Sequence, residues 1–240
     1  MNKLTKFIGV TMLVLFFVGA IANHYAAELS IWYMKNVSAT RDKVPQAYLV
    51  PVNRPLPVAD MRDNKGQEKC LGLTFRTNWG TPAARSVAKS SIELTYSGSR
   101  KITVIKNAGL ACFILAYVKA GNQQYIDVAG DEQNAYGVVK PILEVTPVNI
   151  QSFGPREEIN RQNARLIFKI VNIPKCENIY RLVNSNVDVL EFYGHNGEVR
   201  GAVADVADNK GHFYQVLISD PNVNQAEVEQ MLSTMKIEAK

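Results

Sequence analysis

Histidine and cysteine are scarce in this chain, with three residues of each among 240. His24 lies at the end of an apolar N-terminal segment, whereas His195 and His212 lie at opposite ends of the middle strand of a predicted meander. At ~3.3 Å per residue along a strand, the last two are roughly 25–30 Å apart. They cannot share a metal ion and no C-x-x-C pair replaces them, so we predict no zinc site.

Motifs for nucleophilic catalysis and phosphate binding are also missing. No G-x-S-x-G occurs, and the glycines of residues 194–201 fit hairpin geometry rather than a phosphate-binding loop. The acidic pairs Asp131-Glu132 and Glu157-Glu158 fall in the first turns of predicted helices, where negative charge favours the helix dipole. We therefore predict no catalytic residue, no metal and no cofactor, and a hydrolase is the weakest functional hypothesis.

The net charge of +5 is unevenly distributed along the chain. Residues 1–69 contain nine Lys/Arg and five Asp/Glu, which gives +4, while the remaining 171 residues carry eighteen basic and seventeen acidic side chains, or +1. A nucleic-acid-binding face needs clustered cations on the folded domain. Because the excess lies near the apolar segment instead, we predict no nucleic-acid partner.

The longest apolar run begins at Phe7 and ends at Ala22, with Thr11 as its one polar residue. Two lysines and no acidic residue precede it, a pattern that keeps this end in the cytoplasm and exports the rest of the chain. Sixteen residues are short of a bilayer, but extension to Ala27 reaches the ~20 residues that span one. The sequence thus predicts an N-terminal transmembrane helix.

Retention and removal of this segment are both compatible with the sequence. Trp32 and Tyr33, followed by Lys35, are typical of an interfacial belt, which favours a retained anchor over residues 1–35. An Ala-Ile-Ala site after a run of signal-peptide length makes cleavage after Ala22 the alternative. We expect a single-pass protein of the bacterial inner membrane with a periplasmic C-terminal domain, or a soluble periplasmic protein after cleavage.

Residues 36–69 hold four prolines between positions 45 and 57 and show little periodicity. Proline at this density favours extended, polyproline-like chain, so this Pro-rich linker is predicted to hold the domain off the membrane. Extended chain also binds partner proteins at low entropic cost. Tyr48, Leu49 and Val50 are the predicted docking contacts for such a partner.

Residues 70–240 are predicted to form an α+β domain, with an antiparallel sheet flanked by helices. The patterns of apolar residues, turns and helix starts predict strands at 70–75, 91–96, 100–106, 110–118 and 165–171 and helices at 81–90, 130–140 and 154–164. Cys112 falls inside the strand predicted at 110–118, where a buried thiol behaves as a small apolar side chain.

The last third of the chain has the clearest pattern. Residues 187–219 are predicted to form a three-stranded meander, with turns at Asn196-Gly197 and at 209–211. A helix capped by Asn224 follows. Its apolar residues recur at i, i+3, i+4 and i+7 and must pack on the sheet; they are Val228, Met231, Leu232 and Met235.

This ending resembles the PsbP-like proteins, whose domain is an antiparallel sheet between helices. The similar stretches are "LEFYGHNGEVRG", "GHFYQVLIS" and "EVEQMLSTMKIE", and "LTFRTNWG" is similar to their opening strand with its Trp-Gly. The resemblance covers about half of the domain and rests on pattern. It implies a small, usually non-enzymatic domain that assists a larger membrane assembly, and it transfers no functional residues.

Three cysteines in an oxidising compartment predict one disulfide and one free thiol. Cys70 and Cys176 have polar neighbours in the sequence and are the predicted pair. Cys112, in its apolar run, is then the free thiol.

Two functions of different classes remain. The first is a non-enzymatic, membrane-anchored periplasmic accessory or assembly subunit of an envelope complex, with protein partners in the envelope. The alternative is a periplasmic small-ligand-binding module released by cleavage after Ala22. Four aromatic residues of the meander could line its pocket, although alternation along strands favours the core for half of them; they are Phe192, Tyr193, Phe213 and Tyr214.

Overall fold

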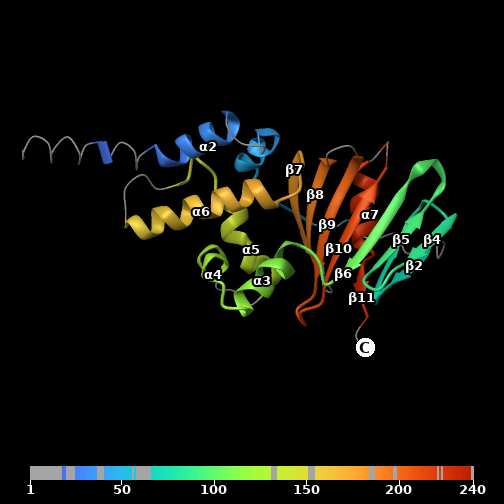
Figure 1. Ribbon diagram of the computed structural model, residues 1–240. Coiled ribbons are helices and arrows are strands. Elements are labelled where there is room, and N and C mark those ends of the chain that lie inside the picture. Colours follow the sequence, from blue (N-terminus) through green and yellow to red (C-terminus); the bar gives the residue numbers. More distant parts are fainter. Residues whose placement is uncertain are drawn as a thin grey trace, which may run out of the picture.

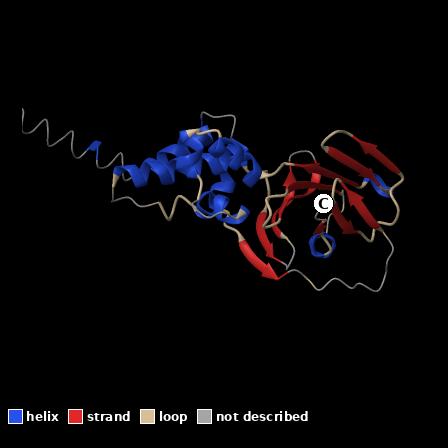
Figure 2. Ribbon diagram, turned by 90° about the horizontal axis from the view of Figure 1, so that it is seen from below, coloured by secondary structure: helices blue, strands red, loops and turns tan. Residues whose placement is uncertain are grey.

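A layer of helices packs against one face of a large sheet in the computed structural model of this protein, and a small sheet with one helix covers the other face (Figure 1). Figure 2 shows the same separation of helices from strands, seen from below. The described residues are 18–19, 25–36, 41–55, 57, 66–130, 134–150, 155–183, 187–196, 199–220, 222 and 224–238.

The helices and strands follow one another in an α+β order. The helices are α2 (Ala26–Asn36), α3 (Leu110–Lys119), α4 (Gln123–Val128), α5 (Ala135–Glu144), α6 (Arg156–Asn172) and α7 (Gln225–Ser233), with 3-10 helices η1 (Arg41–Tyr48) and η2 (Ser97–Ser99). The strands are β1 (Val52–Pro55), β2 (Gln67–Cys70), β3 (Leu73–Arg76), β4 (Ala84–Val87), β5 (Ser91–Thr95), β6 (Lys101–Lys106), β7 (Asn178–Val183), β8 (Asp188–Asn196), β9 (Val199–Ala207), β10 (Phe213–Ser219) and β11 (Lys236–Ile237).

The large sheet has eight strands in the order β1-β7-β8-β9-β10-β6-β5-β4. Its neighbours pair antiparallel, except that β1 runs parallel to β7 with Val52 opposite Tyr180. The small sheet has the order β11-β3-β2. The predicted α+β class is confirmed, while the predicted antiparallel sheet is in fact mixed because the strand β1 joins its edge.

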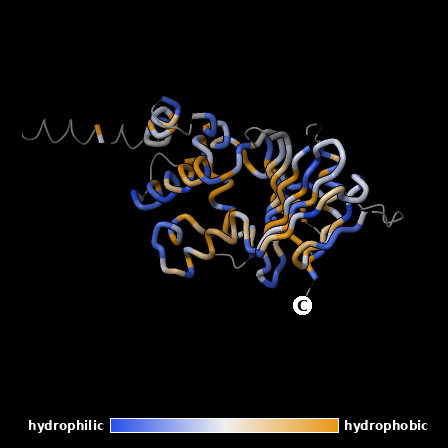
Figure 3. Tube along the Cα trace, turned by 45° about the vertical axis from the view of Figure 1, so that its right-hand side comes forward, coloured by the Kyte–Doolittle hydropathy of each residue, from blue (hydrophilic) through white to orange (hydrophobic). Residues whose placement is uncertain are grey.

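Alternation along the central strands builds a core on each face of the large sheet. On β9, Ala202, Ala204 and Val206 face the small sheet and α7, whereas Val203 faces the helices. Hydrophobic residues accordingly follow the strands and the inner sides of the helices (Figure 3). A sheet covered on both faces has apolar residues at nearly every position, unlike a sheet with one solvated face.

The predicted meander and terminal helix are confirmed. Strands β8, β9 and β10 pair in sequence order, and Gly211 supplies the positive φ of the second turn. Asn196 is still within β8, and the predicted turn residue Gly197 lies outside the described residues. Asn224 caps α7 by accepting a hydrogen bond from the Ala226 N–H at 2.9 Å. All four residues of its apolar stripe are buried: Val228, Met231, Leu232 and Met235.

Two predicted strands are helices in the structure. The run at 110–118 forms α3, and the run at 165–171 is the second half of α6. In α6, Leu166 and Ile170 are buried one turn apart, while Ile167 is exposed. A short apolar run cannot be assigned by periodicity alone, because both a buried strand and a helix against a core produce it.

The helix predicted at 81–90 is wrong, because residues 84–87 form β4 and pair antiparallel with β5. Its N-terminal signals were local, whereas the backbone hydrogen bonds come from a neighbouring strand. The strand predicted at 70–75 is two strands, β2 and β3, separated by Leu71 and Gly72, both with positive φ. The helix predicted at 130–140 overlaps α5, which begins at Ala135 and continues through Pro141, the predicted end, to Glu144.

The predicted Pro-rich linker is largely part of the domain where it is described. Residues 41–48 form η1, whose Val44 and Ala47 are buried. The Lys43 amine donates to the Val171 carbonyl at 2.9 Å and the Gln46 amide to the Cys176 carbonyl at 3.2 Å. The chain then enters the large sheet as β1, so this segment is bound to the body and is not an extended spacer.

Most of the predicted membrane segment lies outside the described residues, which include positions 18–19 and 25–35 of it. In the described parts, no helix combines the length and the apolar character needed to cross a bilayer. Helix α2 packs on α6 and η1 through Ile31 and Met34, which are 5% and 6% exposed. The helix that follows the apolar run is therefore fixed to the helical layer (Figure 1).

A buried lysine joins two of these helices. Lys169 of α6 is fully buried, and its amine donates to the carbonyls of Leu143 and Val145 at 2.7 Å each. These carbonyls belong to the end of α5, where backbone acceptors lack partners within the helix. Burial lowers the pKa of Lys169 to about 8.

We predict that Lys169→Met lowers the free energy of unfolding by about 3 kcal/mol, because it leaves two buried carbonyls without a donor. The check is urea denaturation at neutral pH. Lys140→Met, which removes the same charge from an exposed position of α5, should stay within about 0.5 kcal/mol of the wild type. Equal stability of the two variants would contradict this role.

Candidate functional site

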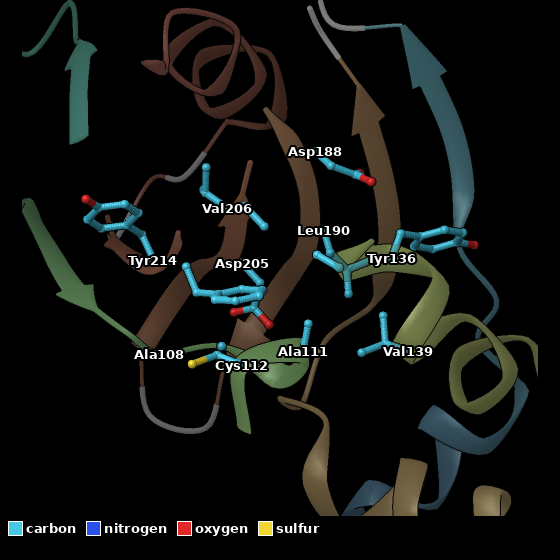
Figure 4. Close-up of a pocket in the computed structure, with 14 residues that line it drawn as sticks. Ala108, Ala111, Cys112, Tyr136, Val139, Asp188, Leu190, Asp205, Val206 and Tyr214 are labelled. Carbon is cyan, nitrogen blue, oxygen red and sulfur yellow. The ribbon is translucent and has the colours of Figure 1, made fainter. Parts of the chain in front are cut away.

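A narrow pocket lies between the starts of α3 and α5 and the strands β8, β9 and β10 (Figure 4). Ala111, Val139 and Leu190 give it a mostly apolar wall, and Asp205 supplies a carboxylate. The interior volume is about 20 Å³, which is room for about one water molecule. A metabolite-sized ligand would need several hundred Å³.

The Asp205 carboxylate is tied to the protein at both oxygens. Oδ2 accepts from the Leu110 N–H at 2.6 Å, at the first residue of α3, and Oδ1 accepts from the Gln215 amide at 3.1 Å. Gly109 has a φ of +109°, and a Cβ there would lie 2.9 Å from the carboxylate carbon. Burial raises the pKa of Asp205 to about 6, against the two hydrogen bonds that favour the ionised form.

Other polar side chains that line the pocket turn away from Asp205. Figure 4 shows the Cys112 sulfur and the Tyr136 hydroxyl pointing outward. The Tyr136 hydroxyl donates to Glu144 at 3.2 Å, and the Arg181 guanidinium lies over its ring at 3.8 Å. Arg181 also contacts both carboxylate oxygens of Asp188, at 3.4 and 3.2 Å. These residues form a structural network that joins α5 to β7 and β8.

The arrangement can therefore hold a proton or one water molecule, and it anchors the start of α3 by charge at the positive end of the helix. Among the described residues, no three His, Cys, Asp or Glu side chains cluster as metal ligands do. Sequence reasoning missed Asp205, although a signal existed. It is a charged residue at an inward position of a strand with apolar neighbours on both faces.

The four aromatic residues proposed to line a ligand pocket divide between the two faces of the sheet. Phe192 and Phe213 pack with the helices, whereas Tyr193 and Tyr214 pack with the small sheet and α7. The Tyr214 hydroxyl donates to the Leu71 carbonyl at 2.9 Å. Their alternation thus places them in two separate cores, as the structural interpretation of the sequence expected.

The predicted cysteine pair is not formed. Cys70 and Cys176 are both free and buried, and they belong to cores on opposite faces of the large sheet. Burial raises the pKa of Cys70 to about 11 and that of Cys176 to about 12, so both stay as thiols at neutral pH. Cys112 is partly exposed on α3 rather than buried in a strand.

The described histidines do not meet, in agreement with the sequence analysis. His195 in β8 pairs with Arg200 at one end of β9, and His212 precedes β10 at the other. The His212 Nδ1 lies 2.8 Å from an Asp208 oxygen. Hydrogen bonds from the side chain and the backbone of His212 lower the pKa of Asp208. His24 lies outside the described residues.

The three residues predicted to dock a partner differ in their exposure. Leu49 packs against the core under the helices, so it is used within the protein. Tyr48 and Val50 are 50% and 44% exposed and remain accessible to a partner. Two of the three predicted residues therefore lie on the surface.

A larger aromatic surface lies on α3 and α4, and we call it the α3–α4 surface. It consists of Phe113, Tyr117, Tyr125 and Ile126. Tyr117 and Tyr125 stack with ring centroids 4.3 Å apart, and Phe113 lies edge-on to both at 5.0 and 5.6 Å. Phe113 and Tyr117 are each 40% exposed. The incorrect strand assignment hid this surface, because only a helix brings i and i+4 together.

A second exposed apolar surface, the α2 face, consists of Leu29, Trp32 and Tyr33. These side chains are 53%, 61% and 56% exposed, on the sides of α2 that do not pack on α6 and η1. Aromatic residues of this kind are typical of the boundary between membrane and water.

Comparisons with protein-family models, with curated proteins and with solved structures found no match to this chain. The functional argument therefore rests on the geometry above. The pocket at Asp205 is small and internally satisfied, whereas the α2 face and the α3–α4 surface are exposed and apolar. Surfaces of this kind fit binding better than they fit chemistry on a small molecule.

We predict that Asp205→Asn makes the fall of stability with rising pH between about 4 and about 6 shallower. The folded-state pKa of Asp205 lies above its ordinary value, so the wild type binds this proton more tightly when folded and loses about 2 kcal/mol as pH rises through this window. Urea denaturation across the window measures it. Asp127→Asn on the exposed side of α4 is the control, and an Asp205→Asn profile parallel to the wild type would refute the role.

Proposed function

We propose that this protein is a non-enzymatic accessory or assembly subunit of a bacterial envelope complex, attached to the inner membrane by its N-terminal residues with the domain in the periplasm. The observation that carries the proposal is the α2 face. Helix α2 follows the apolar run of residues 7–22 directly, is fixed to the helical layer by Ile31 and Met34, and leaves Trp32 and Tyr33 exposed.

The packing of α2 on the helical layer would determine how the domain lies at the membrane. An apolar side chain left in water costs roughly 25 cal/mol per Å² of exposed apolar area, and the headgroup region removes that cost. Because η1 and β1 bind the following segment to the body, the domain would lie close to the bilayer rather than on a long tether. The helical layer would then face the membrane-proximal space.

The α3–α4 surface is the part of this layer best suited to a protein partner. Stacked, partly exposed aromatic rings are rigid and lose little conformational entropy on binding, which is why such residues dominate interface energies. Tyr125 also lies edge-on to Phe168 at 5.7 Å, so the surface is supported from the core. The resemblance of the C-terminal part to PsbP-like proteins agrees with an assisting role in a membrane assembly.

The alternative, a soluble module that binds a small ligand, has less support. The pocket at Asp205 has an interior of about 20 Å³, and its carboxylate is already bonded at both oxygens. The aromatic residues proposed for a ligand pocket lie in two separate cores.

We predict that Tyr117→Ala weakens association with the envelope partner by about 30-fold, the loss expected when a central interface aromatic is truncated at ~2 kcal/mol. The full chain is extracted in mild detergent, and partner recovery is compared by quantitative mass spectrometry. Because Tyr117 is 40% exposed, the fold should tolerate the change.

Two matched variants locate the partner surface. Tyr48→Ala truncates the exposed tyrosine of the sequence-predicted docking segment. Val87→Ser changes a residue that is 66% exposed on β4, the edge strand at the far end of the large sheet. Both should retain the partner. Recovery lost in Tyr48→Ala alone would move the interface to η1, and a wild type without any stable partner would end the proposal.

A further inference from the structure

A buried carboxylate lies on the opposite face of the large sheet from Asp205. Glu191 of β8 is 0% exposed, and its side chain points toward α7. In the ladder it lies opposite Tyr180 of β7 and Ala204 of β9. Figure 1 shows α7 lying against this face. A carboxylate in such a place requires partners that compensate for the loss of water.

One amide group joins Glu191 to a second carboxylate. The Gln225 Nε2 donates to Glu191 Oε2 at 3.1 Å and to Glu229 Oε1 at 2.8 Å. The only cation bonded to this group among the described residues is Arg54 of β1, which donates to Glu229 Oε1 at 2.9 Å. Arg54 also lies over the Tyr180 ring at 4.1 Å. Glu191 and Glu229 therefore share the Gln225 amide, and Arg54 binds Glu229.

Two oxygens in this cluster are buried without a hydrogen-bond partner in the part of the chain that the structure describes. They are Glu191 Oε1 and Gln225 Oε1. An ionised carboxylate cannot donate to an amide oxygen, so both atoms stay unsatisfied as long as Glu191 is charged. A proton on Glu191 Oε1 would make this oxygen a donor, and the Gln225 amide oxygen is an acceptor without a partner in the same cluster.

We propose that Glu191 is a neutral carboxylic acid in the folded protein, that its proton bonds it to the Gln225 amide oxygen, and that release of this proton to solvent loosens α7 and β1 from the sheet. The loosening follows because the buried charge then faces Glu229 across the shared amide. Arg54 and Glu229 connect β1 to α7, so strain on the amide reaches both elements.

On balance, the surroundings of Glu191 raise its pKa. Its burial is the main cause that raises its pKa, to about 8; the Glu229 charge adds to the rise, and the Gln225 hydrogen bond and Arg54 oppose it. Tyr180 and Tyr193 are the titratable groups that flank it on β7 and β8, and β9 presents the uncharged Ala204.

The raised pKa of Glu191 determines the direction in which stability changes with pH. The folded state holds this proton more tightly than the unfolded chain does, so stability falls as pH rises from about 4 to about 8. Asp205 acts in the lower part of this window, and Lys169, with a lowered pKa, acts in the opposite sense above about 8. The interval between about pH 6 and about pH 8 therefore isolates Glu191.

The consequence concerns the segment that joins the helical layer to the sheet. Strand β1 follows η1 after three residues and, among the described residues, pairs with β7 alone. Residues 52–55 are exposed along their whole length, so few contacts other than the ladder and Arg54 hold them. The cluster would thus make the connection between the membrane-facing helices and the sheet sensitive to external pH, whatever the partner of the protein is.

Hydrogen exchange of the full chain in detergent, read by mass spectrometry, tests this inference. After correction for intrinsic exchange rates, amides of 225–233 and 52–55 should open about tenfold more readily at about pH 8 than at about pH 6. Amides of β5 and β6 should not change. Glu191→Gln, the neutral isostere, should abolish the difference, and Glu229→Gln, which removes the charge that faces Glu191, should reduce it. Equal protection of the wild type at both pH values, or a difference that persists in Glu191→Gln, would overturn the inference.

If Glu191→Gln does not fold, a measurement on the wild type alone tests the inference. Infrared spectroscopy distinguishes a protonated carboxylic acid from a carboxylate. At about pH 7, Asp205 is mostly ionised and ordinary carboxyl groups are fully ionised, so a carboxylic-acid band that disappears by about pH 9 supports the inference. Absence of that band at about pH 7 would overturn it.

Discussion

Burial of the large sheet on both of its faces is the constraint on which the rest of the structure depends. Helices α3, α5 and α6 need one face to cover their apolar sides, and the small sheet with α7 needs the other. Because strand positions alternate, the buried apolar residues described on β8, β9 and β10 divide between the two cores. A charged residue on these strands therefore enters a core, where it must find a specific partner or carry a proton.

Three buried ionisable groups meet this requirement in a common way, because each lies at the end of a helix. Lys169 donates to the carbonyls at the C-terminal end of α5, and Asp205 accepts from the first amide of α3. Both charges match the sign of the helix dipole at that end. Glu191 contacts Gln225 at the first residue of α7, but it shares this amide with Glu229, so its compensation is incomplete. The polar groups inside the protein thus attach helices to the sheet, and their protonation states affect how firmly they do so.

The exposed apolar groups are distributed differently from the buried charges. They concentrate on the helical layer, on α2 and on α3 and α4, while the edge strand β4 presents mainly small and polar residues with Val87 as its exposed apolar side chain. The helical layer therefore carries the α2 face and the α3–α4 surface. At the small pocket, Asp205 attaches the start of α3 to the sheet.

The sequence by itself determined the α+β class, the meander of β8, β9 and β10, and helix α7, because turn residues, alternation and the Asn224 cap are local signals. Strand length alone also separates His195 from His212. Only the tertiary structure decided that 110–118 and 165–171 are helical, because a short apolar run has the same composition in a buried strand and a packed helix. It also decided that the proline-rich segment joins the domain through η1 and β1, and that Lys169 and Glu191 are fully buried. The partners in those cases are far away in sequence, and burial depends on what packs against a residue rather than on the residue itself.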